Sequence, residues 1–210
     1  MKIALIISLF SISILAALTV SAKKVVTKTE VKTTTEAKYA PAGKTLSFKQ
    51  ADGKVRFLAV GKPAMIKIVG EGTGPHGDLT IADDKLQGTL TIDMKMLTTK
   101  IDLRDEHMKN KYLEVEKYPT STITFKNYSL KLASLTPIAI EQPFTADLQL
   151  HGVTKPVVGT IKFSKEILTV TGVATFKIKV TDFMDTLPSY AGIKIADDIE
   201  VTVDLKTTTN

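Results

Sequence analysis

Charged side chains gather in one stretch of the chain, and their types could bind an anion or transfer a proton. Arg104, Asp105 and His107 lie close together between Ile101 and Pro119. The guanidinium group of an arginine is a planar fork that suits a phosphate or a carboxylate. The simpler interpretation is a structural ion pair, in which Arg104 and Asp105 pair with each other or with strand ends and fix this stretch on the rest of the fold. The sequence leaves both interpretations open.

Motifs of catalysis are missing from the sequence. It contains no cysteine, and it has no Gly-x-Ser-x-Gly, His-Glu-x-x-His or phosphate-loop motif. Asp102, Asp105 and Glu106 could supply a carboxylate pair, but carboxylates are common on exposed helices. The three histidines are far apart in the sequence, so we expect no metal site. We predict a protein that is not an enzyme and has no catalytic residues, metal or cofactor.

The composition indicates a mildly basic chain, with a formal net charge of +6 over 210 residues. Its lysines are scattered, and no arginine-rich or aromatic-interleaved patch is present, so we expect no nucleic-acid partner. A basic surface would also allow transient contact with an anionic membrane. The sequence leaves the formation of a homodimer open.

The N-terminal segment has the pattern of an export signal. Lys2 precedes an apolar run over residues 3–20, and Val20-Ser21-Ala22 has the small residues of a cleavage site. We predict a signal peptide at 1–22, cleaved after Ala22, with an uncleaved membrane anchor as the alternative. The protein would then be periplasmic or secreted.

The predicted folded domain begins after a polar spacer. Residues 23–43 are rich in threonine and lysine, and they carry too little apolar surface to offset the entropy lost on ordering. We therefore predict a flexible spacer at 23–43, a folded domain at 44–206 and a tail at 207–210.

Strand periodicity dominates the predicted domain. Apolar and polar residues alternate along most of it, as in strands with one buried face, and most clearly over residues 86–96. No alternation of strands with helices is present, so an antiparallel barrel or sandwich follows. Small residues on the inward faces, such as Gly159 and Gly172, favour a barrel.

Three further features give local expectations. Asp52-Gly53 suits a tight hairpin between strands at 45–50 and 54–60. Residues 70–77 are predicted to form a glycine-rich loop, without the Gly-Lys-Ser/Thr end of a phosphate loop. His151 is expected at a strand–turn junction, bonded to the backbone.

The stretch at 102–117 is the exception to the strand pattern, and it is predicted as a short, broken helix. Its apolar residues are spaced irregularly, and Pro119 ends it. A single helical insert in a run of strands usually covers an edge or an open end of the sheet.

Two motifs together resemble a known family. The first motif is Thr99, then Arg104-Asp105-Glu106-His107, then Tyr118-Pro119 and Ile123-Thr124-Phe125. The second is Leu148-Gln149-Leu150-His151-Gly152-Val153-Thr154-Lys155-Pro156. In this order they resemble the YceI-like family of exported lipid-binding proteins, over residues 44–206. Residues 179–184 keep an Asp-Phe pair but lack the arginine and glycine of the family's pattern.

This resemblance implies an all-β fold: an eight-stranded, antiparallel, lipocalin-like β-barrel with the helical insert near residues 102–117 beside its opening. It also implies that the lumen holds a long-chain isoprenoid, such as a quinone or a polyprenyl phosphate, or a similar amphiphile, for transport or storage. The alternative is a non-enzymatic structural or stress-response protein of the envelope whose barrel is filled by its own side chains.

A ligand in the barrel would contact the inward strand faces and the insert. Methionine side chains are flexible and polarizable, which suits contact with an alkyl chain, although filling gaps in the core is their simpler role. The predicted ligand-binding residues of the lumen and its mouth are Met94, Met96, Arg104, His107, Met108, Tyr112, Phe125, Leu148, Phe163, Phe176 and Phe183.

Overall fold

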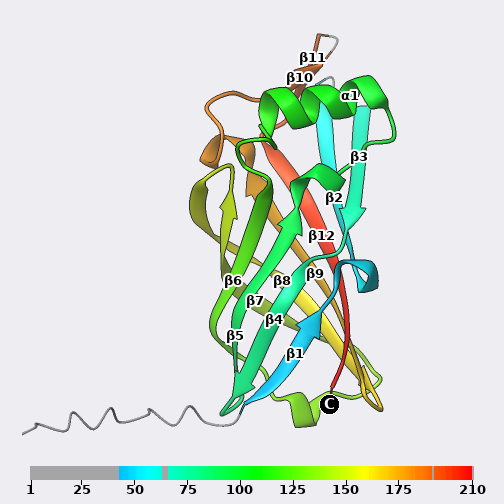
Figure 1. The fold of residues 1–210 in the computed structure, drawn as a ribbon, viewed down its shortest axis with the longest axis vertical. Coiled ribbons are helices and arrows are strands. Elements are labelled where there is room, and N and C mark those ends of the chain that lie inside the picture. Colours follow the sequence, from blue (N-terminus) through cyan, green and yellow to red (C-terminus); the bar gives the residue numbers. More distant parts are fainter. Residues whose placement is uncertain (1–42, 63–65, 191, 210) are drawn as a thin grey trace, which may run out of the picture. The chain divides into compact units, whose positions relative to one another are not determined.

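The structure is a computed structural model, and it describes residues 43–62, 66–190 and 192–209 (Figure 1). The predicted signal peptide at 1–22, and the predicted spacer at 23–43 apart from Gly43, lie outside the described residues. Among the helices that are described, none combines the length and the apolar character needed to cross a bilayer.

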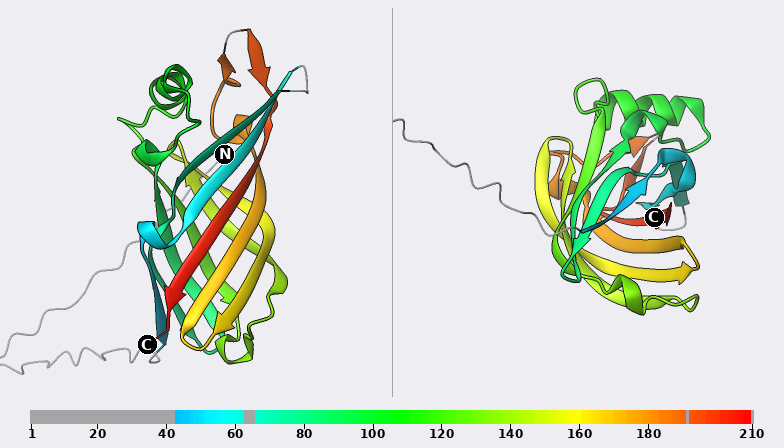
Figure 2. Two further views of the ribbon diagram at one scale, coloured as in Figure 1. Left: turned by 90° about the vertical axis from the view of Figure 1, so that its right-hand side faces the viewer. Right: turned by 60° about the horizontal axis from the view of Figure 1, so that its bottom comes forward.

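A single antiparallel β-sheet of twelve strands makes up most of the described chain, and it curls strongly into a barrel (Figures 1 and 2). The strands are β1 (Lys44–Phe48), β2 (Lys54–Lys62), β3 (Ile66–Thr73), β4 (His76–Ala82), β5 (Lys85–Asp93), β6 (Thr120–Ser129), β7 (Ile140–Leu150), β8 (Val153–Glu166), β9 (Thr169–Lys179), β10 (Ser189–Tyr190), β11 (Ile193–Ile195) and β12 (Asp198–Thr208). The helical elements are η1 (Gln50–Asp52), η2 (Met94–Met96), α1 (Asp102–His107), η3 (Met108–Tyr112), η4 (Leu132–Ser134) and η5 (Val180–Asp182).

The all-β class and the curled antiparallel sheet confirm the predicted fold, but the expected count of eight strands differs from the twelve observed. Part of the difference comes from β10 and β11, which span only two and three residues. Strands of this length are too short to show an alternating pattern in the sequence.

The sheet curls until its edges meet other parts of itself. Its strands follow the order β1-β4-β5-β6-β7-β8-β9-β12-β2-β11-β10, and β3 pairs with β2. At one end of the barrel, the hydroxyl group of Thr207 on β12 donates a hydrogen bond to the carbonyl oxygen of Ser47 on β1. At the other end, Glu71 of β3 and Thr98, which follows η2, exchange two backbone hydrogen bonds of 2.8 and 2.7 Å. These contacts close the wall of the barrel.

The predicted hairpin at Asp52-Gly53 is wrong, because β1 pairs with β4 and not with β2. The link between β1 and β2 is the single turn η1, and Gly53 is extended, with a φ of −143°. Its missing side chain serves close packing, since a Cβ atom there would lie 2.5 Å from the carbonyl oxygen of Asp204.

The predicted glycine-rich loop at 70–77 is also wrong. Strand β3 continues to Thr73 and β4 begins at His76. The glycines make room for other side chains: a Cβ atom at Gly70 would lie 2.1 Å from the ring of Phe57, and one at Gly72 would lie 2.8 Å from the side chain of Leu97. Glycine inside a strand often marks such a close approach.

The helical insert is present but shorter than the predicted range of 102–117. Helix α1 continues directly into the π-helical turn η3, which ends at Tyr112. Glu114 then adopts a positive φ of 44°, and its carbonyl oxygen accepts hydrogen bonds from the backbone of Lys117 and Tyr118. This reversal ends the helix before Pro119 is reached.

Tight packing fills the barrel at the end farther from the insert. The ring of Phe144 packs against Phe125 and Phe176, with centroid separations of 5.8 and 6.0 Å. Gly159 lies under this cluster, where a Cβ atom would come within 2.8 Å of the Phe144 ring. The side chains with less than 2% exposure include Leu46, Leu86, Leu90, Leu130, Ile161 and Val170.

Replacing Ile161 by alanine should therefore be costly. Ile161 is 1% exposed, whereas Val158 on the same strand is 68% exposed. We expect Ile161→Ala to lower the free energy of unfolding by about 2–5 kcal/mol, since it leaves a cavity in packed surroundings. Val158→Ala should change it by no more than about 0.5 kcal/mol. Urea unfolding of both variants measures the difference, and equal small effects would contradict a filled barrel end.

Candidate ligand cavity

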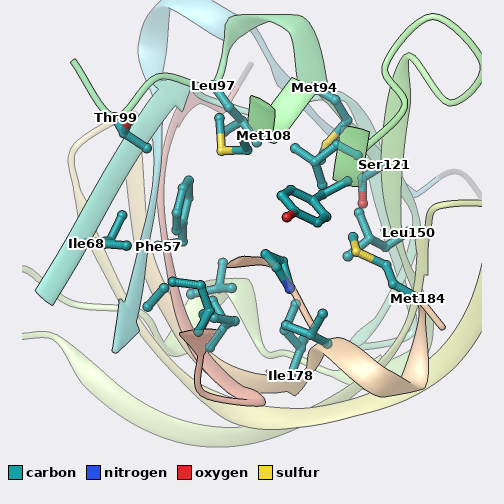
Figure 3. Close-up of a pocket in the computed structure, with 18 of the residues that line it drawn as sticks. Phe57, Ile68, Met94, Leu97, Thr99, Met108, Ser121, Leu150, Ile178 and Met184 are labelled. Atoms are coloured by element: carbon teal, nitrogen blue, oxygen red, sulfur yellow. The ribbon is translucent and has the colours of Figure 1, made fainter. Parts of the chain in front are cut away.

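An apolar cavity of about 200 Å³ lies inside the barrel at the end that carries the insert. Figure 3 shows side chains from several strands and from the insert converging on it, among them Phe57, Ile68, Met108, Ile178 and Met184. The wall is formed by the inward faces of β2, β3, β5, β6, β7, β9 and β12. Such a space, apolar with a few polar groups, has the character of a small-molecule site.

Phe176 separates the cavity from the filled end of the barrel. Its ring lines the cavity, and it also meets the ring of Phe144 edge to face, at an interplanar angle of 86°. Phe144 and Phe125 lie beyond it in the packed core. Among the described residues, this cavity therefore lies on the side of Phe176 that faces the insert.

Arg104 and Asp105, at the start of the insert, are joined through Thr99 and not through a direct ion pair within the described residues. Arg104 donates from Nε to the hydroxyl oxygen of Thr99 over 2.8 Å and from Nη2 to its carbonyl oxygen over 2.9 Å. Asp105 accepts from the Thr99 backbone N–H at 2.7 Å and from the hydroxyl groups of Thr99 and Thr98 at 2.5 Å each. The predicted ion pair is thus replaced by a shared threonine.

This network favours the charged form of Asp105. Burial raises the pKa of its carboxyl group, but the hydrogen bonds from Thr98 and Thr99 outweigh burial and lower the pKa below its usual range. A carboxylate with several donors is a strong acceptor. The charged Asp105 therefore fixes the first turn of α1 to the segment before it, and Arg104 stays at the lining of the cavity.

A second contact holds the far end of the insert. The hydroxyl group of Tyr112 donates to the carbonyl oxygen of Ser189 over 2.7 Å and accepts from the Ser189 backbone N–H over 3.0 Å. Tyr112 and Ser189 both line the cavity. The insert is thus attached to the wall on two sides, at Thr99 and at Ser189.

Glu71 reinforces the wall where β3 meets the segment before the insert. Its carboxylate forms ion pairs with Lys100 at 2.9 Å and with Lys54 at 3.0 Å. Side-chain hydrogen bonds from Lys100 and then Lys54 lower the pKa of Glu71 from 4.5 to about 2. Because the backbone of Glu71 also pairs with Thr98, one residue ties three segments together.

The two family-like sequence motifs meet beside the insert. His151 lies in the turn between β7 and β8, and its Nε2 is 2.6 Å from a carboxylate oxygen of Glu114. The His151 ring also packs on Tyr118, with a centroid separation of 4.3 Å. Gly152 has a φ of 76°, and a Cβ atom there would lie 2.8 Å from the Tyr118 ring. The expected backbone partner of His151 is therefore wrong, and both motifs serve to anchor the end of the insert.

The predicted ligand-binding residues divide into two groups in the structure. Those that line the cavity are Met94, Arg104, His107, Met108, Tyr112, Leu148 and Phe176. Met96 is 47% exposed on the surface, whereas Phe125, Phe163 and Phe183 are buried outside the cavity lining. Contact of a ligand with any of these residues stays a prediction.

Several lining residues were not among the predicted ones. Phe57 and Ala59 of β2 and Ile199 of β12 line the cavity. The period-two pattern places each on an inward face, and this signal could have found them. The pattern does not reveal which inward residues border empty space.

Metal binding has no candidate in the described part of the chain, where no group of three His, Cys, Asp or Glu side chains is arranged to hold an ion.

The fold and the cavity define a class of protein: a curled antiparallel barrel with an apolar chamber at one end and polar groups at its rim. The sequence profile of the YceI-like domain matches residues 38–207. The chain therefore belongs to the YceI-like family. No curated protein sequence matches the chain.

Solved structures share this fold at low sequence identity. A polyisoprenoid-binding domain from Saccharophagus degradans, implicated in plant cell wall breakdown, is 16% identical, with a TM-score of 0.60 over 79% of this chain and 98% of that one. BcnA of Burkholderia cenocepacia is 17% identical, with a TM-score of 0.61 over 77% and 99%. The YceI protein of Campylobacter jejuni is 20% identical, with a TM-score of 0.56 over 70% and 87%. These likenesses establish the fold.

Acid should weaken the wall of the cavity through Glu71. Its pKa is lower in the folded protein, about 2, than the ordinary 4.5. Its ion pairs therefore stabilise the fold fully above pH 4.5 and lose their effect as the pH falls towards 2. We expect the unfolding free energies of the wild type and Glu71→Gln to converge over this range, measured by urea unfolding at several pH values. Lys100→Gln, which removes one of the two ion pairs, should reduce this pH-dependent part of the unfolding free energy. If the difference between wild type and Glu71→Gln is the same at low pH as at neutral pH, the ion pairs of Glu71 do not stabilise the fold in this way.

Proposed function

We propose that the protein binds a long-chain isoprenoid or a similar amphiphilic lipid in the cavity, and that it carries or stores this ligand after export, without catalysing a reaction. The observation that carries the proposal is an apolar chamber between the inward strand faces and the insert. Each methylene group of the ligand that moves from water into the cavity contributes about 0.8 kcal/mol to the free energy of binding. The description of the Saccharophagus neighbour as a polyisoprenoid-binding domain supports the same class of ligand, and the predicted signal peptide supports export to the periplasm or the medium.

The headgroup of the ligand is assigned to the rim, beside the insert. Arg104, His107 and Tyr112 bring polar atoms to the cavity lining there, whereas Phe176 and Leu148 from the strands are apolar. Arg104 uses Nε and Nη2 to bind Thr99, and its Nη1 is the donor that we assign to the headgroup. A guanidinium suits a phosphate best, and it also donates to the carbonyl oxygen of a quinone.

The size of the cavity limits how much of a chain it holds without movement. An apolar cavity of about 150 Å³ binds one benzene molecule, and this cavity measures about 200 Å³. A longer chain requires lining side chains to move. Met94, Met108 and Met184 line the cavity, and unbranched methionine side chains adapt to new shapes at low cost. We expect these methionine side chains to change conformation when a longer chain binds.

Filling the cavity should weaken binding. Val201 on β12 lines it, whereas Val173 on the paired strand β9 is 40% exposed and lies outside the lining. We expect Val201→Phe to weaken the binding of a polyprenol by about tenfold, because the ring displaces about two methylene groups of ligand. Val173→Phe makes the same exchange on the outer face and should bind normally. Fluorescence titration with a labelled polyprenol measures both, and equal affinity of the two variants would contradict the cavity as the site.

The contribution of Arg104 can be tested with charged and neutral ligands. Arg104→Gln should weaken polyprenyl phosphate by about 10- to 100-fold, the range expected for losing a hydrogen bond to a charged group. Binding of the neutral polyprenol should stay near the wild-type level, which also serves as a check on folding.

The control for Arg104 is the only other arginine of the chain, Arg56. It forms an ion pair of 2.8 Å with Asp204 and lies outside the cavity lining. Arg56→Gln should bind both ligands like the wild type. If Arg104→Gln binds the phosphate and the alcohol with unchanged affinities, the headgroup does not lie at Arg104.

A further inference from the structure

We infer that the rim of the cavity is a docking surface for a membrane that contains anionic lipids. The surface has two parts. The first, the basic rim, consists of Lys62 on β2, Lys67 on β3 and Lys194 on β11, all of which are exposed. The second, the aliphatic rim, consists of Ile101 and Leu103 at the start of the insert, which are 48% and 53% exposed.

The three lysines share the outer face of the strands whose inner face lines the cavity. Lys62 is directly opposite Lys194 in the pairing of β2 with β11, and Lys67 is opposite Val60 in the pairing of β2 with β3. Because Val60 is two positions from Lys62, all three side chains fall on one face. The neighbouring Ala59, Ile68 and Ile195 point the other way and line the cavity.

The positive charges of the basic rim repel one another. Like charges directly opposite each other on paired strands are destabilising, and Lys62 and Lys194 stand in this relation. None of the ion pairs among the described residues involves Lys62, Lys67 or Lys194. An anionic surface would relieve this repulsion. A bilayer with acidic lipids attracts each basic residue near its surface by about 1 kcal/mol.

The aliphatic rim lies across the opening from the basic rim. In Figure 2 the insert and the arm of β10 and β11 project on either side of the open end of the barrel. Ile101 and Leu103 thus expose large aliphatic side chains at the same end as the lysines. Apolar side chains on the face of a peripheral element enter the boundary between headgroups and acyl chains.

A bilayer fits this combination better than an acidic protein does. On the insert, Asp102 and Glu106 offset Lys109 and Lys111, so the electrostatic attraction falls on the basic rim and the insert contributes apolar contact. The basic part suits the acidic headgroups of a membrane surface, and the aliphatic part suits the acyl chains beneath them. Docking in this orientation would bring the cavity to the bilayer, so that an amphiphile enters without crossing water. That last consequence rests on the proposed function, whereas docking itself does not.

Vesicle binding with matched charge reversals tests the proposal. The full chain, as purified from cells, is sedimented with vesicles of phosphatidylcholine alone or mixed with phosphatidylglycerol. The test variant is Lys62→Glu, Lys67→Glu and Lys194→Glu combined. The control combines Lys85→Glu, Lys131→Glu and Lys206→Glu. These are exposed lysines near the β4–β5 turn, at η4 and near the C-terminal end of β12, at the opposite end of the barrel (Figure 1).

We expect the wild type to bind the anionic vesicles, with an affinity that falls as salt is added, and to bind neutral vesicles far more weakly. The test variant should lose at least about 100-fold in affinity, given about 1 kcal/mol for the attraction of each of the three lysines, and the control should lose much less. Leu103→Ser should also weaken binding to the anionic vesicles. The size of this effect should not depend on the salt concentration, because the contact that is lost is apolar. Thermal unfolding checks that each variant is folded, and a triple Lys→Gln variant provides a milder replacement.

Three results would overturn the proposal: no binding of the wild type to anionic vesicles, equal binding to neutral ones, or equal losses in the two triple variants. Binding of a polyprenol in detergent, measured on the same variants, reports on the cavity alone. It should be unchanged, so that a failure of docking and a failure of the proposed lipid binding are seen separately.

Discussion

The cavity depends on the backbone pairing of Glu71 with Thr98. A curled sheet leaves two edges, and an open edge beside an apolar chamber would expose both the chamber and unpaired backbone groups to water. The two hydrogen bonds between these residues join β3 to the segment that leads into the insert. The ion pairs of Glu71 with Lys54 and Lys100 strengthen the same junction. The insert then follows within a few residues, fixed by Asp105 to Thr98 and Thr99, so wall and rim are one connected structure.

A second constraint divides the barrel into a packed end and a hollow end. The aromatic cluster around Phe144 fills one end, and Phe176 is shared between the cluster and the chamber. One half of the barrel is thus filled by its own side chains, and the other half contains the cavity.

The sequence predicted the strands and the insert because alternation and its interruption are local properties. It predicted less about the site because the site depends on which strands are neighbours. Phe125 and Phe176 both face inward, and only the three-dimensional packing places the second at the chamber and the first outside it. The roles of Gly70 and Gly53 also depend on side chains and backbone far away in the chain, so a glycine-rich segment looked like a loop and an Asp-Gly pair looked like a hairpin. The hydrogen bond between Tyr112 and Ser189 joins residues that are 77 positions apart, so no local sequence pattern could predict it.

The most direct test of this account is the identity of the molecule held by the native protein. The protein would be purified from the compartment where it resides, extracted with organic solvent and analysed by mass spectrometry, before and after incubation with quinones and polyprenols. If the cavity holds lipid in the native protein, the extract contains an isoprenoid or a similar amphiphile in stoichiometric amount. An extract that stays empty after both treatments would contradict the account and favour a structural protein whose chamber is only an imperfection of packing.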